Sequence, residues 1–460
     1  SDHLGKKVFM CNGTACMTSG KQEKLKKALA RKFGENKIGA VSCLGYCHSG
    51  NAFLTDHTTC SFEDIDNPDI IVKHHNESEV TFSVGSNLEN PVLITEITDL
   101  TEYYSILYEY SENIPLALKE IEISSLRGRG GAGFPLHIKL TTSANTHSNK
   151  KFVVCNADEG DPADTGVIYI RGEYPESVKA VYSAIEEFKK QKLFLTDQSG
   201  KEFNFTFHLF EGAGAYICGE ETSLINSLEG LRPEVRSRPP FPATYGLFGK
   251  PTILCNVETF ANLWYILKAG GLTYSATGTK KSKGTKLVSL DGAFHNPGIY
   301  EVKMGTPLHE ILYEMGGGTK YPVKAFQIGG PLGGIVPVAI TEELSLDFES
   351  FTEAGFLLGH AGFVSIPEEF PMMKFILHLF EFTSKESCGK CFPCRIGSQR
   401  GYELLKDAAE TGSKIDKELF ADLLETMQLG SLCALGGGIS LPVMNALHYF
   451  SSEFEEYFNI

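Results

Sequence analysis

The 460-residue sequence lacks the hallmarks of several large protein classes. No uncharged apolar stretch is long enough to span a bilayer, and the first residues lack the apolar run of a signal peptide. Asp and Glu number 57 against 42 Lys and Arg, and the resulting net charge of −15 argues against a nucleic-acid-binding protein, which needs a basic face. No low-complexity tract or internal repeat is present. We therefore expect a soluble, cytoplasmic protein of three or four domains.

Cysteine is the residue type that carries most of the chemical information, with twelve in the chain. A cytosolic protein keeps its thiols reduced, so we do not expect disulfides. Eight of the cysteines fall into two groups with the spacing of metal ligands. The other four are scattered, and we expect each to be a small buried residue: Cys60, Cys155, Cys218 and Cys255.

The C-terminal group has C-x2-C-x2-C spacing at Cys388, Cys391 and Cys394, followed by Cys433. Tight turns return each of the first three sulfurs to the same small volume, and the remote thiol completes a set of four. Four thiolates with this spacing are typical of a [4Fe–4S] cluster. The alternative, a zinc site, usually has two separated C-x2-C pairs. We therefore predict an iron–sulfur cluster and one-electron chemistry.

The N-terminal group, Cys11, Cys16, Cys43 and Cys47, has C-x4-C and C-x3-C spacing. This spacing suits a [2Fe–2S] cluster, and zinc is the alternative because tetrahedral thiolate sites serve both metals. A strand at 7–10, a helix at 22–33 and a strand leading to Cys43 predict a small α/β domain.

Further along the chain, a helix is expected near 100–120. Short β-like runs at 286–337, with a helix at 307–315, predict a separate α/β unit. From 371 onward the pattern is helical.

A glycine-rich segment at 128–133 is the first candidate for cofactor binding. The bare backbone at Gly128, Gly130, Gly131 and Gly133 would let N–H groups approach a phosphate, with charge from Arg127 and Arg129. An ordinary tight turn is the alternative. Phe134 is a candidate platform for an adenine ring.

Polar residues after a strand at 151–155 form a second candidate. Asn156, Asp158 and Glu159 lie where ligands of open α/β sheets gather, and they could hold a heterocycle edge and ribityl hydroxyls. Asn and Asp are also ordinary turn formers. Glu220 and Glu221 are expected to open a helix, where acidic residues are favoured by the helix dipole alone.

Together these blocks resemble one family, over residues from about 95 to 455. It is the flavoprotein subunit that carries FMN and oxidises NADH in respiratory complex I, and in the diaphorase modules of soluble hydrogenases and NAD-dependent formate dehydrogenases. The N-terminal cysteines resemble the thioredoxin-like [2Fe–2S] domain of the companion subunit, here fused ahead of the flavoprotein. The blocks are 126–135, 155–162, 212–222, 238–242, 256–259 and 386–391.

The resemblance implies a multidomain α/β fold. We expect a thioredoxin-like [2Fe–2S] domain at 1–80 and a Rossmann-like FMN/NAD(H)-binding domain at 81–275. A β-grasp-like (SLBB-type) domain would follow at 276–360, and a helical bundle carrying the [4Fe–4S] cluster at 361–460.

The resemblance also implies roles for individual residues. Positions that match FMN contacts are Gly128, Gly130, Lys139, Asn156, Asp158, Tyr216, Gly219, Glu220 and Asn256. Positions that match the surroundings of NAD(H) are Phe134, Glu221, Arg238 and Phe241, with Glu221 as the candidate catalytic residue. Cys388, Cys391, Cys394 and Cys433 match the [4Fe–4S] ligands.

The sequence departs from the family pattern near the nucleotide pocket. The segment 136–140 differs from the usual continuation, Thr142 replaces an aromatic residue, and Cys255 replaces an Asn. The next strand begins near Val167, soon after Asp161-Pro162, so only about half a dozen residues are left to connect the two strands. Parallel neighbours usually need a crossover of roughly a dozen residues. Either the two strands pair differently or a segment is missing, and we favour the second explanation.

The expected function is that of a diaphorase that passes electrons from NAD(H) through FMN to the clusters, as one subunit of a larger oxidoreductase. The chain ends at Ile460 without a ferredoxin-type tail, so we expect electrons to leave for a partner, such as a catalytic iron–sulfur subunit of a hydrogenase or formate dehydrogenase. The alternative is an electron-transfer or assembly subunit that keeps its clusters, and perhaps flavin, but has lost NAD(H) binding.

Overall fold

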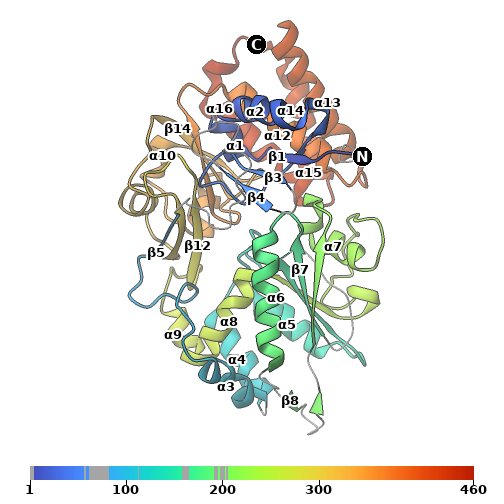
Figure 1. The fold of residues 1–460 in the computed structure, drawn as a ribbon, viewed down its shortest axis with the longest axis vertical. Helices are drawn as coiled ribbons and strands as arrows, with labels where there is room; N and C mark the ends of the chain where they lie inside the picture. Colours follow the sequence, from blue (N-terminus) through green and yellow to red (C-terminus); the bar gives the residue numbers. More distant parts are fainter. Residues whose placement is uncertain are drawn as a thin grey trace.

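The computed structural model describes residues 5–55, 58–61, 82–111, 113–157, 165–190, 195–196, 202–203 and 206–459 (Figure 1). Its first unit is a four-stranded sheet of order β2-β1-β3-β4. β1 (Val8–Cys11) pairs in parallel with β2 (Ile38–Val41), and β3 (Phe53–Thr55) and β4 (Thr58–Cys60) add antiparallel strands. Helix α2 (Gln22–Phe33) buries Leu25 and Leu29 against this sheet. The predicted strand–helix–strand order is confirmed.

The second unit is a parallel sheet of order β10-β7-β6-β11. Its strands are β6 (Phe152–Ala157), β7 (Thr165–Arg171), β10 (Thr206–Gly212) and β11 (Thr252–Asn256). One face packs its apolar side chains against α7 (Glu221–Leu228). The other face contributes to a core with residues of α5 (Leu136–Asn145) and α8 (Val257–Ala269), while α6 (Pro175–Lys190) lies against β7 and β10. Short elements complete this unit: η3 (Tyr216–Gly219), η4 (Leu247–Gly249), α9 (Gly271–Ser275), β8 (Leu195–Thr196) and β9 (Glu202–Phe203).

Two expectations for this unit need correction. The single helix expected near 100–120 is two helices, α3 (Leu100–Ser111) and α4 (Ile114–Ser124). The second begins at Asn113, whose side chain accepts a hydrogen bond from Leu116 N, with a proline in the first turn. The second correction concerns the short connection near 162: of the two explanations, different pairing of the strands is excluded because β6 and β7 are parallel neighbours, and the favoured one, a missing segment, stays a prediction.

The third unit is a six-stranded sheet of order β15-β14-β16-β12-β13-β5. Its strands are β5 (Ser83–Ser86), β12 (Thr285–Leu290), β13 (Gly298–Lys303), β14 (Val323–Ile328), β15 (Ile335–Pro337) and β16 (Gly362–Pro367). The expected helix at 307–315 is present as η5 (Glu310–Met315), a π-helical segment. Helices α10 (Val338–Thr341) and α11 (Phe348–Glu353) follow β15. The sheet takes β5 and β16 from outside the predicted 276–360 domain.

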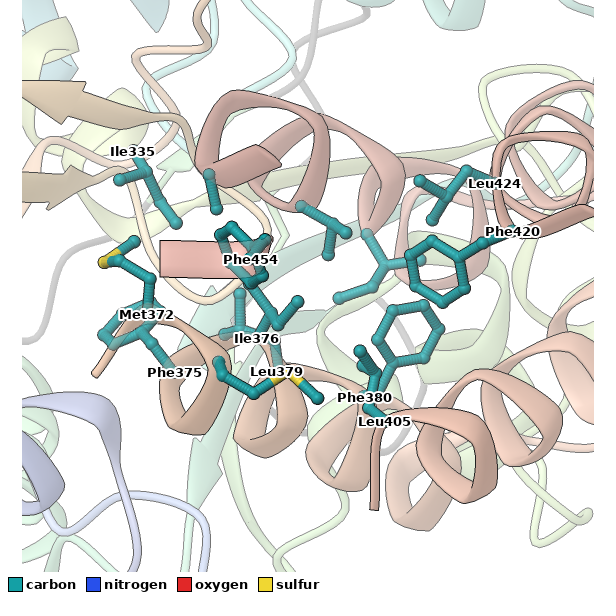
Figure 2. Packing of buried hydrophobic residues seen from close by; sticks show 14 of the residues in the cluster. Ile335, Met372, Phe375, Ile376, Leu379, Phe380, Leu405, Phe420, Leu424 and Phe454 are labelled. Carbon is teal, nitrogen blue, oxygen red and sulfur yellow. The ribbon is translucent and has the colours of Figure 1, made fainter. Parts of the chain in front are cut away.

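The C-terminal part is helical, as predicted. Its helices are α12 (Met372–Glu386), α13 (Phe392–Thr411), α14 (Lys417–Gly430), α15 (Ala434–Gly438) and α16 (Ser440–Tyr449). Their core includes Phe375, Phe380, Leu405 and Phe420; Figure 2 shows Phe380, Leu405 and Phe420 close together, and Phe375 beside Met372 at the other end of the cluster. Small elements close the bundle: β17 (Ile415–Asp416), η6 (Ser451–Phe454) and β18 (Phe458–Asn459). N-terminal helix α1 (Thr14–Thr18) touches β16, and η1 (Glu35–Lys37) precedes β2.

Among the described residues, no helix is both long and apolar enough to cross a membrane.

Candidate active site

A cavity of about 430 Å³ lies where the second sheet meets the C-terminal bundle. Such a volume is within the range of roughly 300–1,000 Å³ that is usual for small-molecule sites. Five residues predicted to bind FMN line it, together with one predicted cluster ligand: Gly130, Asn156, Tyr216, Gly219, Glu220 and Cys433. Arg171, Ile217, Leu332, Ala434 and Leu435 complete the lining. The structure therefore brings the two predicted sites together around one cavity.

Two asparagine side chains of the candidate site lie at the carboxyl ends of β6 and β11. Asn156 Nδ2 donates to the carbonyl of Gly219 at 3.0 Å, which fixes the amide at the cavity. Asn256 caps α8, where its side chain accepts from Thr259 N at 3.1 Å. Gly130 lies against Asn256, since a Cβ at position 130 would meet Asn256 Cβ at 3.4 Å. The position of both amides at strand ends follows from the parallel order of the sheet.

The glycine-rich segment adopts a conformation that needs glycine at two positions. Gly131 and Gly133 have φ values of +121° and +60°, which side chains disfavour. Arg127 donates to the Gly133 carbonyl at 2.7 Å and pairs with Glu349 at 2.6 Å. Its charge is therefore directed away from the cavity.

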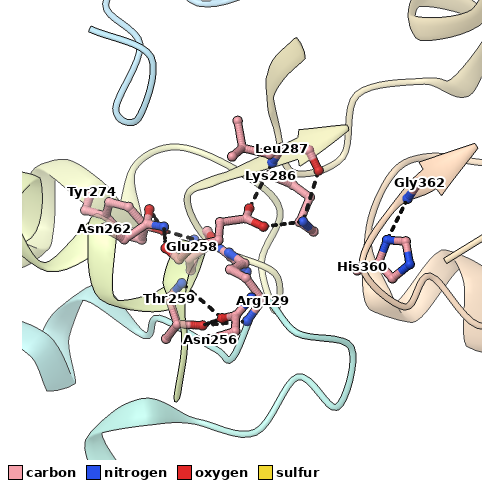
Figure 3. Close-up of polar contacts among 11 residues, drawn as sticks. Arg129, Asn256, Glu258, Thr259, Asn262, Tyr274, Lys286, Leu287, His360 and Gly362 are labelled. Carbon is pink, nitrogen blue, oxygen red and sulfur yellow. Dashed lines mark hydrogen bonds and ion pairs between the residues drawn. The ribbon is translucent and has the colours of Figure 1, made fainter. Parts of the chain in front are cut away.

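Arg129 also turns away from the cavity. Its side chain is fully buried and donates to Tyr274 Oη at 3.1 Å and to the Lys283 carbonyl, while its backbone N–H donates to Thr259 (Figure 3). Within the described chain, Nε and Nη1 have no hydrogen-bond partner. Contact between Arg129 and a cofactor stays a prediction.

Glu220 and Glu221 begin α7, as predicted. Glu220 caps the helix, with Oε2 accepting from Thr222 N and Ser223 N, both at 2.9 Å. Its other oxygen, Oε1, is buried and accepts no hydrogen bond from the described residues. That oxygen lies 3.7 Å from Arg238 Nη2. A buried carboxylate oxygen that accepts no hydrogen bond is costly, so this cavity wall is suited to a ligand that donates one.

Glu221 joins two basic side chains beside the cavity. Its carboxylate pairs with Lys139 Nζ at 3.0 Å and with Arg238 Nη1 at 2.8 Å. Lys139 also donates to the Leu254 carbonyl at 3.1 Å. The aromatic candidates Phe134 and Phe241 are exposed by 46% and 56%. Both rings are thus available for stacking.

Asp158 and Glu159 lie outside the described residues. Their predicted roles stay predictions.

The C-terminal thiols gather at the beginnings of two helices. Cys391 precedes α13 and Cys433 precedes α15. The pKa of Cys394 is raised to about 11, mainly by burial and also by the nearby Cys388, Cys391 and Cys433 thiols, while a hydrogen bond with Ser387 lowers it. Burial also raises the pKa of Cys433, whereas the backbone N–H groups of residues 435 and 436 lower it. The four predicted ligands therefore form one group, with N–H donors directed at the thiol nearest the cavity.

The N-terminal thiols form a second group. The Cys11 thiol is within hydrogen-bonding reach of Cys16 and Cys43, and Cys43 is within reach of Cys47. These neighbours raise the pKa of Cys11 and lower that of Cys43, to which Gly45 N also donates at 3.4 Å. Over the described chain, no three His, Cys, Asp or Glu side chains converge closely enough to hold one metal ion. The N-terminal ligand set is thus supported by contacts between its thiols, and the C-terminal set by the electrostatic influence of its thiols on one another.

Two residues connect these groups and were missed in the sequence. Glu386 accepts from Tyr216 N at 2.9 Å and from the hydroxyl of Ser42, the residue before Cys43. Arg171, at the end of β7, lines the cavity and pairs with the buried Glu173 at 3.0 Å. Arg171 could have been predicted by the reasoning used for Asn156, since both lie at the carboxyl end of a parallel strand. No local sequence pattern indicates the partners of Glu386.

Comparisons with known proteins agree with this arrangement. The family model of the NADH-ubiquinone oxidoreductase-F iron-sulfur binding region matches residues 374–457. The Nuo51 FMN-binding domain matches as two segments, 121–165 and 162–265, which meet at the short β6–β7 connection.

Several curated proteins are similar over most of their length. The NADP-reducing hydrogenase subunit HndC of Solidesulfovibrio fructosivorans is 38% identical, covering 73% of this chain and 74% of that protein. A subunit of NADH-quinone oxidoreductase from Rhizobium meliloti is 37% identical, covering 73% of this chain and 86% of that protein. In fold, the chain resembles a chain of NAD+-reducing [NiFe]-hydrogenase in the air-oxidized state, with a TM-score of 0.82 and 24% identity over 99% of this chain and 85% of that one.

Proposed function

The chain belongs to the NADH-quinone oxidoreductase-F family of FMN-binding flavoproteins, and we propose that its cavity is where NADH delivers electrons. It is a diaphorase-type subunit of a multisubunit NADH-oxidising complex. The observation that carries the proposal is the shared cavity, lined by Gly130, Asn156, Gly219 and Glu220 on one side and by Cys433 on the other.

The residues at the cavity suit FMN. No described atom lies within 4 Å of a Cβ built on Gly219, so the backbone there faces open space. Glu220 Oε1 offers a buried acceptor that receives no hydrogen bond from the described residues and has only the more distant Arg238 guanidinium as an ionic partner, and the Asn156 amide is held at the same wall. Bound FMN would supply a centre that exchanges two electrons with NADH and single electrons with a cluster.

For NAD(H), the support comes from exposed aromatic rings beside charged groups. Phe134 and Phe241 offer faces for the adenine ring, and the Lys139–Glu221–Arg238 ion pairs place polar groups next to the cavity. Glu221 would orient the nucleotide, with its own position held by the two cations. Hydride transfer needs no acid or base from the protein, so stacking and positioning are the contributions we assign to these residues.

The four C-terminal thiols would hold a [4Fe–4S] cluster and the four N-terminal thiols a [2Fe–2S] cluster. Cys433 supports the first assignment most directly, because it is both a cavity-lining residue and a member of the C-terminal group. The N-terminal assignment is supported by the contacts among the four thiols and by the Ser42–Glu386–Tyr216 link to the cavity wall. The electrons would leave for a partner iron–sulfur protein of the same complex.

A direct test uses anaerobic, FMN-loaded protein mixed with NADH. We expect flavin absorbance to bleach, followed by the electron paramagnetic resonance signals of reduced clusters. Glu220→Gln should weaken flavin binding, whereas Glu229→Gln, whose carboxylate pairs with Arg236 away from the cavity, should not. Flavin-loaded protein that NADH fails to bleach would instead support a protein without NAD(H) binding, which the curated relatives do not favour.

A further inference from the structure

Two cysteines outside both cluster groups lie opposite each other in the second sheet. β6 and β11 are parallel neighbours, and their register pairs Cys155 with Cys255. Register partners project from the same face of a sheet, with neighbouring strands about 4.8 Å apart. That spacing is within the roughly 4.4–6.8 Å between Cα atoms that a disulfide spans. The structure contains both residues as thiols, close enough for Cys255 to raise the pKa of Cys155.

The two thiols differ in access. Cys255 is 8% exposed and belongs to the core formed with α5 and α8, whereas Cys155 is partly exposed. Val153, two residues before Cys155 on the same face, is 38% exposed. Cys155 is therefore the more exposed of the two thiols, and the one we expect a small molecule to reach before Cys255.

Each thiol directly precedes a residue of the candidate site. Asn156 lines the cavity, and Asn256 caps α8 and lies against Gly130. Any change in the distance between residues 155 and 255 is therefore transmitted to both asparagines through one peptide unit.

We propose that Cys155 and Cys255 are a reversible dithiol that a low-molecular-weight disulfide, such as oxidised glutathione, converts to a disulfide that alters flavin binding. The Cys155 thiolate attacks one sulfur of the glutathione disulfide and releases one glutathione thiolate, leaving a mixed disulfide. The Cys255 thiolate then attacks the Cys155 sulfur and releases the second glutathione. Two protein thiols are oxidised, one disulfide is reduced to two thiols, and the two protons lost by the protein are taken up by the released thiolates.

The expected bond is strained and therefore easily reversed. A disulfide holds its Cβ atoms about 3.5–4.5 Å apart, less than the strand spacing of about 4.8 Å. The strands must approach each other to form the bond, and strained disulfides are the more readily reduced ones. The same approach displaces Asn156 and Asn256. The effect of the disulfide on flavin binding rests on the proposed function, whereas the formation of the disulfide rests only on the strand register.

The pH dependence of the reaction follows from burial. Burial raises the pKa of Cys155 to about 12, with a further contribution from Cys255. Burial raises the pKa of Cys255 to about 11, where Lys139 on α5 lowers it and Glu221 on α7 raises it. The reactive thiolate fraction therefore rises about tenfold per pH unit below these values. Exchange should be slow near pH 7 and about tenfold faster at one pH unit higher.

The test uses the anaerobically purified full chain, incubated with oxidised glutathione and quenched with N-ethylmaleimide. Peptide mass spectrometry should find residues 155 and 255 linked, with the link removed by dithiothreitol. Flavin affinity of the oxidised sample should fall several-fold and recover on reduction. Glutathione retained on Cys155 without a link, or reaction confined to other cysteines, would overturn the proposal. A link that leaves flavin affinity unchanged would overturn its regulatory part.

Two variants sharpen the result. Cys255→Ser should stop the reaction at the mixed disulfide on Cys155, and Cys60→Ser, which removes a buried thiol of the N-terminal sheet, should leave the 155–255 link intact. The main measurement detects the 155–255 disulfide in the wild-type protein without flavin. The proposal can therefore be tested even if one of the variants fails to fold. A chain that forms the link but never binds FMN would contradict the proposed function and not the dithiol.

Discussion

Replacing Gly219 with alanine separates cofactor binding from folding. A Cβ at this position would meet no described atom within 4 Å, and the residue ends η3 without a positive φ. Alanine should therefore leave the fold intact, and the loss of backbone freedom in the unfolded chain should stabilise the protein by about 0.4–1 kcal/mol. The added methyl group enters the cavity instead. Crowding a packed site costs about 1–3 kcal/mol, which corresponds to a rise in the flavin Kd of about 5- to 140-fold.

The assay has two parts. Urea unfolding of the flavin-free protein gives the free energy of unfolding, and fluorescence titration with FMN gives Kd. Gly128→Ala tests a predicted FMN position that does not line the cavity, and its Cβ would meet Phe134 backbone atoms at the ordinary distances of 3.6 and 3.8 Å. An unchanged Kd in a stable Gly219→Ala protein would refute the placement of FMN beside this residue. A lower stability would refute the finding that the position faces open space.

Three further substitutions test other contacts. In Gly436→Ala the new Cβ would lie 2.5 Å from Cys394 Cβ, so we expect less bound iron and a loss of about 1–3 kcal/mol, measured by iron analysis and urea unfolding. Normal iron content would contradict this packing. Glu386→Gln replaces a charged acceptor for Tyr216 N with a neutral one, and hydrogen exchange in residues 38–47 should become faster, whereas Glu381→Gln on the same helix should not change it. In Lys286→Met the buried partner of Glu258 is lost, so the free energy of unfolding should fall by roughly 3–5 kcal/mol; a loss under about 1 kcal/mol would show that the ion pair is dispensable.

Local sequence patterns predicted much of the fold because the relevant forces are local. Apolar spacing predicted the C-terminal helices, and the acidic pair at 220–221 predicted the start of α7. The boundary between α3 and α4 was missed although Asn113 and a following proline are ordinary helix-start signals. The membership of β5 in the third sheet was not predictable, because its pairing with β13 joins residues more than 200 positions apart.

In the candidate site too, local sequence patterns predicted some features, whereas others depend on residues far apart in the sequence. The residues at strand ends and in the loop before α7 were found because parallel strands direct their carboxyl ends to one edge of a sheet. The direction of a long side chain depends on distant partners instead. Arg129 donates to Tyr274 and to the Lys283 carbonyl. Lys286, which is 1% exposed, pairs with Glu258 of α8, as Figure 3 shows. Burial lowers the pKa of Lys286, while the Glu258 carboxylate raises it, so the charge is retained only through a contact that no local motif encodes.

The connection between β6 and β7 links the main sequence departure to the proposed dithiol. Seven residues separate Ala157 from Thr165, and the two strands pair over five residues in parallel. The usual connection between parallel neighbours is a helical crossover, but seven residues can reach roughly 25 Å and five strand residues span roughly 17 Å, so this number of residues is sufficient to join the two strands. Parallel sheets are normally covered on both faces by such helices. On the face that carries Val153 and Cys155, both side chains retain exposure, and this exposure is the property on which the proposed attack of Cys155 on a small disulfide depends.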